Sequence, residues 1–282
     1  MSIRIRMALL IVLMIAMIPT VAMGGGGGGT DVARDTVGLY RSSGLWILRA
    51  SNAQSCAGAT IAQFVFGTSG DAPLSVDPDG DGLAQATVFR TSDGFGSFFV
   101  RANNTPGAQA ATRINFGAPG DIPIAGNLDA TDAGDEVGVY RPTNNRFYLN
   151  TDSGLVTFPF GAPGDVPIVG NWDGSVNGSE EVGLFRPSTG QFFHRADNLP
   201  GASGVTTRFL GGAGDTPLAG DWDADDNATI AVHRDTGGSG GVFYFNNMTS
   251  GGGVDSQLRF GAGDEAPVSG NWDGRSVDED GC

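Results

Sequence analysis

Short apolar runs, each bounded by Gly, Pro, Asn or Asp, recur along most of this chain. The segment 121–160 shows one full unit, with runs at 121–127, 136–141, 146–150 and 155–160. Runs of this length that are rich in β-branched and aromatic residues predict strands, and the residues between them tolerate turn geometry. No long apolar stripe with a helical period follows Met23. The unit is therefore expected to form four consecutive antiparallel strands.

This unit is repeated along the chain. The stretches "GAPGDIPIAGN" and "GAPGDVPIVGN" begin at Gly117 and Gly161, and a Phe-Gly or Leu-Gly pair ends every copy. Tandem units of about 40–50 residues with several strands each indicate the blades of a β-propeller. The glycines that end the copies lie 44 to 50 residues apart, at Gly67, Gly117, Gly161, Gly211 and Gly261.

The two ends of the repeat region complete each other. Thr36–Arg41 has the pattern of a second strand with no first strand before it, and Ala266–Gly274 has that of a first strand with no second strand after it. Joining them leaves no partial unit. The sequence therefore predicts an all-β fold, a five-bladed β-propeller of four-stranded antiparallel blades, closed by pairing of the N- and C-terminal strands within one blade.

Composition agrees with many short strands joined by tight turns. The 282 residues include 47 glycines and 14 prolines, yet 40% are hydrophobic, which disfavours disorder. The net charge is −15 and the chain contains no lysine. Nucleic acid is therefore excluded as a partner, because its phosphates require basic residues. A phosphate-binding loop lysine and a Schiff-base lysine are excluded as well.

The N-terminal segment has the pattern of an export signal. Arg4 and Arg6 precede the apolar run Met7–Met23, which ends in small residues and is followed by Gly24–Gly29. We expect a signal peptide at 1–22, a Gly-rich linker at 23–30 and the propeller at 31–282. The protein would then be secreted, periplasmic or on the cell surface. The alternative is an uncleaved anchor, which would be the only contact with a membrane.

The two cysteines are expected to lie on one face of the split blade. Cys282 follows the acidic turn after the last predicted strand, and Cys56 lies in the turn between the third and fourth strands. An exported chain with two cysteines favours one disulfide, which would close a long loop. Two unrelated free thiols are the alternative.

Written together, the copies read "GDxPxxGNWDG…EVGLYRPxxGxFxxR". Across roughly Asp31–Cys282 this pattern resembles the FG-GAP/VCBS-type propeller repeats of bacterial surface and secreted proteins, which are related to the integrin α-chain head. The resemblance implies a calcium loop of the form D-x-D-x-D-G-x-x-D between the first and second strands. Oxygen ligands at alternate positions suit a cation that takes six to eight oxygens.

Two of the acidic turns keep most of this loop. One ends on Gln85 and the other on Thr229, in place of the last carboxylate. The resemblance assigns calcium, the only cofactor that the sequence indicates, to these two turns. The ligand candidates are Asp77, Asp79, Asp81, Asp221, Asp223 and Asp225.

The remaining turns depart further from the calcium loop. The turns 127–136 and 171–181 are one residue longer and place Thr131 and Ser175 at the third ligand position. In the split turn Arg275 occupies that position. Asp and Asn side chains commonly satisfy turn backbone on their own. We assign this role to Asp129, Asp173 and Asp273.

A set of arginines and a set of acids recur at equivalent places on the face opposite the acidic turns. Charge-assisted pairing between the two sets would tie strands or neighbouring blades together. Binding of a sugar acid or sulfate by the arginines is the alternative. The arginines end the second strands, at Arg41, Arg90, Arg141, Arg186 and Arg234. The acids begin the first strands, at Asp71, Asp121, Asp165 and Asp215, with Asp264 or Glu265 in the last copy.

Three tryptophans follow the first strands, at Trp172, Trp222 and Trp272. Aromatic side chains of this kind line many sugar sites, but strand alternation turns these away from their polar neighbours. We expect them, with most of the other aromatic residues, to pack between blades.

The residues for catalysis are few. The only histidines are His194 and His233, which fit no metal-binding pattern, and "GGSGG" at 237–241 has no helix behind it. The acids repeat at equivalent places, whereas a catalytic pair needs blades that differ. We expect a non-enzymatic binding or adhesion module for an extracellular carbohydrate or surface protein. A structural scaffold without a small ligand is the alternative, and a propeller-fold glycoside hydrolase is less favoured.

Overall fold

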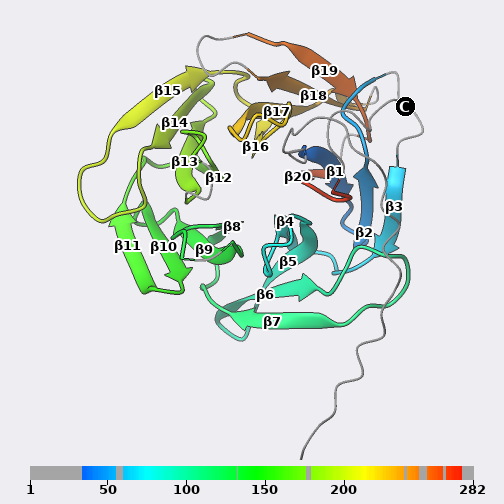
Figure 1. Ribbon diagram of the computed structural model, residues 1–282, viewed down its shortest axis with the longest axis horizontal. Helices are drawn as coiled ribbons and strands as arrows, with labels where there is room; N and C mark the ends of the chain where they lie inside the picture. Colours follow the sequence, from blue (N-terminus) through cyan, green and yellow to red (C-terminus); the bar gives the residue numbers. More distant parts are fainter. Residues whose placement is uncertain are drawn as a thin grey trace, which may run out of the picture. The chain divides into compact units, whose positions relative to one another are not determined.

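The computed structural model is a ring of five four-stranded antiparallel sheets (Figure 1). It describes residues 34–54, 60–131, 133–175, 179–237, 240–247, 253–262 and 265–274. Within these ranges every regular element is a strand, and no helix could serve as a membrane span. The expected all-β propeller with five blades is therefore confirmed. The predicted signal peptide and linker, Cys56 and Cys282 lie outside the described residues.

The blades are numbered here in chain order, each from its inner to its outer strand. Blade 1 comprises β20 (Ala266–Gly270), β1 (Thr36–Tyr40), β2 (Leu45–Arg49) and β3 (Thr60–Val65). Blade 2 comprises β4 (Ala72–Val76), β5 (Gln85–Ser92), β6 (Phe95–Arg101) and β7 (Ala111–Asn115). Blade 3 comprises β8 (Ile122–Gly126), β9 (Glu136–Arg141), β10 (Arg146–Thr151) and β11 (Gly154–Pro159). Blade 4 comprises β12 (Val166–Gly170), β13 (Glu181–Arg186), β14 (Gln191–Arg195) and β15 (Val205–Phe209). Blade 5 comprises β16 (Asp215–Gly220), β17 (Thr229–Asp235), β18 (Gly241–Asn246) and β19 (Ser256–Arg259).

The ring closes where the sequence predicts. Strand β20 pairs antiparallel with β1, from Thr36 opposite Gly270 to Tyr40 opposite Ala266. The indole Nε1 of Trp272 also donates to the carbonyl oxygen of Thr36 at 3.1 Å. Blade 1 is thus built from the two ends of the repeat region, which removes the open junction of an incomplete ring.

The inner strands β4, β8, β12, β16 and β20 contact one another around the axis. Each has a free edge toward the axis, and each carries a proline near its start. A proline has no N–H to donate, so it is tolerated at the unpaired edge of an edge strand. This explains the "GDxP" part of the repeat. The prolines are Pro73, Pro123, Pro167, Pro217 and Pro267.

The core lies between neighbouring sheets. Phe147 and Phe158 of blade 3, both fully buried, pack in one cluster with Val182 and Leu184 of blade 4. Trp222 and Trp272 are buried, and the partly buried Trp172 packs against the cluster between blades 4 and 5. The tryptophans are therefore interior residues, as the strand alternation predicts.

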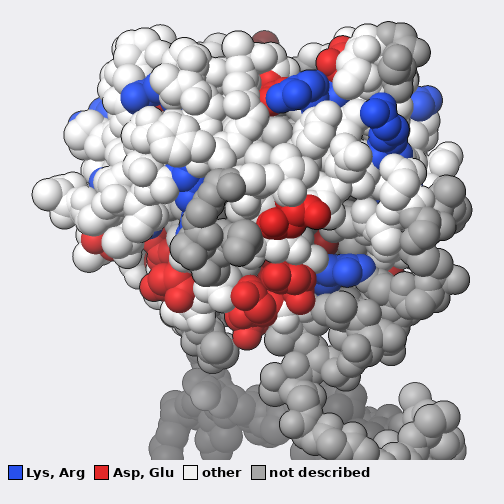
Figure 2. Space-filling view, turned by 90° about the horizontal axis from the view of Figure 1, so that it is seen from above, with Lys and Arg blue, Asp and Glu red and all other residues white. Residues whose placement is uncertain are grey.

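The first-to-second and third-to-fourth strand turns share one end of the ring, which we call the acidic end. In a side view, most visible acidic side chains lie toward one end and most basic ones toward the other (Figure 2).

Candidate functional site

Two turns at the acidic end bring three carboxylates together. The oxygens of Asp77, Asp79 and Asp81, between β4 and β5, lie within 4.8 Å of one another. An equivalent group between β16 and β17 consists of Asp221, Asp223 and Asp225. Among the described residues, these are the groups of three acids that are close enough to hold one ion. They are the six candidates that the resemblance selected.

The backbone of these two turns curls around the carboxylates. Gly80 and Gly82 have φ values of 65° and 82°, and Ala224 and Asp226 take the same left-handed conformation with φ values of 60° and 69°. Ala and Asp carry a steric cost in this region that Gly does not. The fold therefore imposes one loop shape on two different sequences.

The first aspartate of each turn organises the loop. Oδ2 of Asp77 accepts the N–H of Gly82 at 2.8 Å. Oδ2 of Asp221 accepts the N–H of Asp226 at 2.9 Å. Both bonds close the turn onto its first aspartate.

The crowded carboxylates disfavour their own ionisation. Burial, together with Asp225 and Asp221, raises the pKa of Asp223 to about 6. Burial also raises the pKa of Asp77 and of Asp221, and neighbouring aspartates add to both shifts. A bound divalent cation would reverse this preference, because it favours the charged form of each ligand.

Three side-chain oxygens at these turns favour the binding of a cation. Oδ1 of Asp77, Oε1 of Gln85 and Oγ1 of Thr229 are buried without a hydrogen-bond partner among the described residues. Gln85 and Thr229 stand where the calcium loop has its last ligand. A buried oxygen without a partner is costly, and a hard cation would supply one. The residues of both turns therefore fit calcium.

The turn 127–136 uses its polar groups internally. Asp129 accepts hydrogen bonds from the N–H of Thr131 and the N–H of Ser153, both at 3.0 Å. Burial raises the pKa of Asp129, but hydrogen bonds from Thr131 and Ser153 outweigh it and lower the pKa to about 2. Glu136 accepts the N–H of Leu128 at 2.6 Å. This agrees with a turn-stabilising role for Asp129.

The other two turns show the same use of polar side chains. Asp173 accepts the N–H of Ser175 at 2.9 Å. Ser179 donates to Glu181, the carboxylate that ends this turn, at 2.9 Å. In the split turn Asn271 accepts the N–H of Gly274 at 2.9 Å, and Arg275 lies outside the described residues. The structure places Asp273 in this turn, and among the described residues it belongs to no group of three acids.

The recurring arginines and acids form ion pairs at the opposite end. Arg141, for example, binds Asp121 through Nε and Nη2 at 2.7 and 2.8 Å. The acid also accepts an N–H three residues earlier, from Ala118 at 2.9 Å. Both partners belong to one blade, so the pairs tie strands together within blades and not between them. The pairs are Arg41–Glu265, Arg90–Asp71, Arg141–Asp121, Arg186–Asp165 and Arg234–Asp215.

These ion pairs have a structural role. Each acid side chain is at most 1% exposed, whereas the arginines are 32–46% exposed. Four of the guanidinium groups also lie over an aromatic ring of the third strand, as Arg141 does over Tyr148 at 4.5 Å. The arginines are therefore held by their own blade on two sides.

A second set of arginines ends the repeat pattern, but it was assigned no role from the sequence. Arg49, Arg101 and Arg195 end the third strands of blades 1, 2 and 4 and are at most 4% exposed. Each opens a stretch that reads R-A-x-N: "RASN", "RANN" and "RADN". This repeated four-residue pattern is the signal that could have found them.

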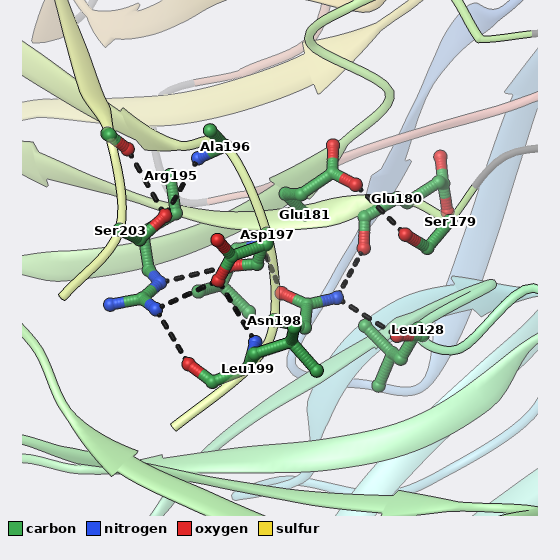
Figure 3. Close-up of polar contacts among 12 residues, drawn as sticks. Leu128, Ser179, Glu180, Glu181, Arg195, Ala196, Asp197, Asn198, Leu199 and Ser203 are labelled. Atoms are coloured by element: carbon green, nitrogen blue, oxygen red, sulfur yellow. Dashed lines mark hydrogen bonds and ion pairs between the residues drawn. The ribbon is translucent and has the colours of Figure 1, made fainter. Parts of the chain in front are cut away.

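The buried arginine orders the third-to-fourth strand turn. Arg195 donates to the carbonyl oxygens of Asp197 at 2.9 Å and Leu199 at 2.8 Å (Figure 3). Its guanidinium also lies 4.2 Å from the ring centre of Phe158 in blade 3. Arg101 and Arg49 similarly lie over Phe64 and Phe260 of the preceding blades.

The asparagine of the pattern fastens the turn to the acidic loops. Asn198 accepts the N–H of Val182 at 3.0 Å and donates to the carbonyl oxygen of Glu180 at 2.7 Å. It also donates to Leu128 of blade 3, so its amide lies between two blades (Figure 3). The third-to-fourth strand turn of blade 4 is thus tied to the first-to-second strand turns of blades 3 and 4.

Neither histidine has the surroundings of a catalytic group. His194 is 2% exposed and stacks on Trp172, with ring centres 3.9 Å apart. Burial, with a smaller effect of Arg208, lowers its pKa to about 3. Burial also lowers the pKa of His233. Both are neutral core residues, and the centre of "GGSGG" lies outside the described residues.

A cavity of about 590 Å³ lies on the axis of the ring. It is lined by the inner strands of all five blades and by residues of the acidic turns, including Asp35, Asp135 and Glu180. Sequence reasoning did not single out these three acids. They belong to three different blades and line one cavity only because the ring is closed.

Comparison with protein-family models, with curated proteins and with solved structures finds no match for this chain.

Proposed function

We propose that this chain is an FG-GAP/VCBS-type propeller that acts outside the cell as a calcium-stabilised, non-enzymatic binding or adhesion module. The observation that carries the proposal is the convergence of three carboxylates in each of two acidic turns. The oxygens without partners at Asp77, Gln85 and Thr229 support calcium as the ion. Export, which the N-terminal pattern indicates, would expose the protein to the millimolar-range calcium that such loops use in extracellular modules.

The acidic end is the proposed contact surface. In blades 1, 2 and 4 the third-to-fourth strand turns are held by the R-A-x-N residues, and Leu199 at one of these turns is 67% exposed. A preformed loop surface lowers the entropic cost of binding. The recurring tryptophans, Trp172, Trp222 and Trp272, pack in the interior and are not available to line sugar sites. This favours a protein ligand over a carbohydrate. A scaffold without a small ligand remains the second candidate, because the two arginine sets serve the fold itself.

Calcium titration of the purified protein tests the metal part of the proposal. The double variants Asp79→Asn/Asp81→Asn and Asp223→Asn/Asp225→Asn each remove two ligand candidates. Asp173→Asn is the matched control, because it changes a similar turn outside the groups of three acids. We expect the wild type and the control to melt at higher temperature in calcium than in chelator, with a reduced difference in each double variant. An unchanged melting temperature on chelation would contradict the calcium proposal.

Ligand capture tests the binding part. A glycan array and a panel of extracellular surface proteins are probed with the full propeller, in calcium and in chelator. Binding to a surface protein that is lost in chelator supports the proposed module. Calcium-dependent binding to one class of glycan would instead indicate a lectin. A lack of binding in both assays would favour the structural scaffold without a small ligand.

A further inference from the structure

The axial cavity has two different ends. Along the inner strands its wall is formed by aliphatic side chains and by the ring of prolines, as at Pro123 with Ile124 and Pro267 with Val268. Toward the acidic end it is lined by six carboxylates and, within the described part of the chain, by no basic residue. A volume of about 590 Å³ is in the range of small-molecule sites. The carboxylates that line it are Asp35, Asp77, Asp135, Glu180, Asp221 and Asp226.

Three of these carboxylates occupy one repeated position, the residue before the second strand. At all five blade junctions the N–H at this position donates to the preceding blade, over 2.6–2.9 Å. In blades 1, 3 and 4 the residue is Asp35, Asp135 or Glu180, and one oxygen of its side chain accepts the return N–H. In blades 2 and 5 the residue is Ala84 or Ala228.

The alanines show what the fold needs at this position. Ala84 bonds to the carbonyl oxygen of Asn271 at 2.7 Å, and Ala228 to that of Asn171 at 2.8 Å. These two junctions close without a carboxylate. The acids at the other three junctions are therefore not required for closing the ring, although they contribute one hydrogen bond each.

Keeping the three acids in the cavity is unfavourable for the protein alone. Burial raises the pKa of Glu180 to about 7, and the charge of Asp35 adds to this shift. All three side chains line the cavity, and one oxygen of each accepts the return N–H. A cation from outside would supply the missing positive charge.

The aliphatic wall indicates what kind of cation fits. A metal ion would occupy a small fraction of the volume and leave the proline ring without a contact. An alkyl amine places N–H donors at the carboxylates and buries methylene groups against the apolar wall. We infer that the axial cavity is a binding site for a small organic amine with an aliphatic chain. Asp35, Asp135 and Glu180 lie outside the two groups of three acids, although Asp35 and Asp135 bond to the first aspartate of those turns.

Isothermal titration calorimetry with 1,5-diaminopentane tests the inference on the full chain, in calcium and again in chelator. The neutral 1,5-pentanediol is the matched probe, since it has the same chain without charge. We expect the diamine to bind at least about tenfold more tightly than the diol under both conditions, because only the diamine can pair with the buried carboxylates. Equal affinity for both probes, or no heat from the diamine at millimolar concentration, would overturn the inference.

The variant Asp35→Ala/Glu180→Ala identifies the site. Alanine stands at this position in two native junctions, so the variant is expected to fold, and its melting curve checks this. We expect it to lose about tenfold or more in diamine affinity, whereas Asp152→Asn, an exposed acid outside the cavity, binds as the wild type does. If the double variant does not fold, the single variants are compared in the same way. Unchanged affinity in folded variants would place the amine elsewhere and refute the inference.

Discussion

The side-chain amide of Asn198 in blade 4 donates to the carbonyl oxygen of Leu128 in blade 3, over 2.9 Å. The same amide bonds to Glu180 in its own blade. Asn104 holds the equivalent place in blade 2, but it bonds to Ala84 and Ala86 of its own blade. One asparagine therefore joins two blades, whereas the other orders a single blade.

We predict that Asn198→Ala lowers the free energy of unfolding by more than Asn104→Ala does. Asn198 is 8% exposed, and its loss leaves buried carbonyl and N–H groups in two blades without partners. Each such group costs about 1–3 kcal/mol. Urea unfolding of both variants and the wild type gives the comparison. Equal losses would show that the bond between blades adds nothing to stability.

The buried Arg101 offers a second test of the R-A-x-N turns. Its guanidinium donates to the carbonyl oxygens of Thr105 at 2.8 Å and Gly107 at 2.6 Å, and it lies 3.8 Å from the ring centre of Phe64. Lysine keeps the charge but lacks the planar fork that makes these bonds. We expect Arg101→Lys to destabilise the fold by about 1–3 kcal/mol. Arg113→Lys, at an exposed position, is expected to change little, and similar effects for the two arginines would contradict this account.

A contact could be predicted from the sequence when the repeat pattern itself contains both partners. Asp121 and Arg141 pair within one blade, and Thr36 and Gly270 are matched by the missing strand at each end, so the repeat alone predicts them. The partner of Glu180 lies in another blade, and the residue at this position is an acid in three blades and alanine in two. Its role emerges only when five copies are closed around an axis.

The calcium turns are an intermediate case. The sequence shows the alternating aspartates. It does not indicate Gln85 and Thr229 as ligands, because neither is the carboxylate that the calcium loop has at its last position. Their oxygens are recognised as candidate ligands only once they are seen to be buried without partners.

A close approach at Gly126 explains the glycine of "GN" in the repeat. A Cβ added there would overlap Oε2 of Glu180 and lie 2.7 Å from Cγ1 of Val169. We expect Gly126→Ala to destabilise the fold by about 1–3 kcal/mol through overpacking. Combining it with Glu180→Ala should restore part of this loss, since the carboxylate is one of the two clashing groups. A double-mutant cycle with urea unfolding measures the coupling, and simple additivity would show that the carboxylate is not in the way.

Glu180 should also make stability decrease as the pH rises. Burial raises its pKa from 4.5 to about 7, so the folded state holds a proton that the unfolded state has already released. Its contribution is present below pH 4.5 and is lost as the pH rises through about 7. Glu180→Gln should therefore show a smaller fall in melting temperature from about pH 5 to pH 8 than the wild type. Parallel pH curves for the two proteins would refute this role.

His194 should act in the opposite direction, at lower pH. Burial and Arg208 lower its pKa from 6.5 to about 3, so below pH 6.5 the unfolded state takes up a proton that the folded state cannot. The wild type should therefore lose stability as the pH falls through this range. His194→Phe removes the titrating group, and Phe245 occupies the equivalent place in blade 5, packed edge-on against Trp222. We expect the variant to retain its melting temperature better than the wild type on acidification. Because the two titrations have opposite signs, a single pH series distinguishes them, and an acid-side loss that persists in the variant would assign the effect to other groups.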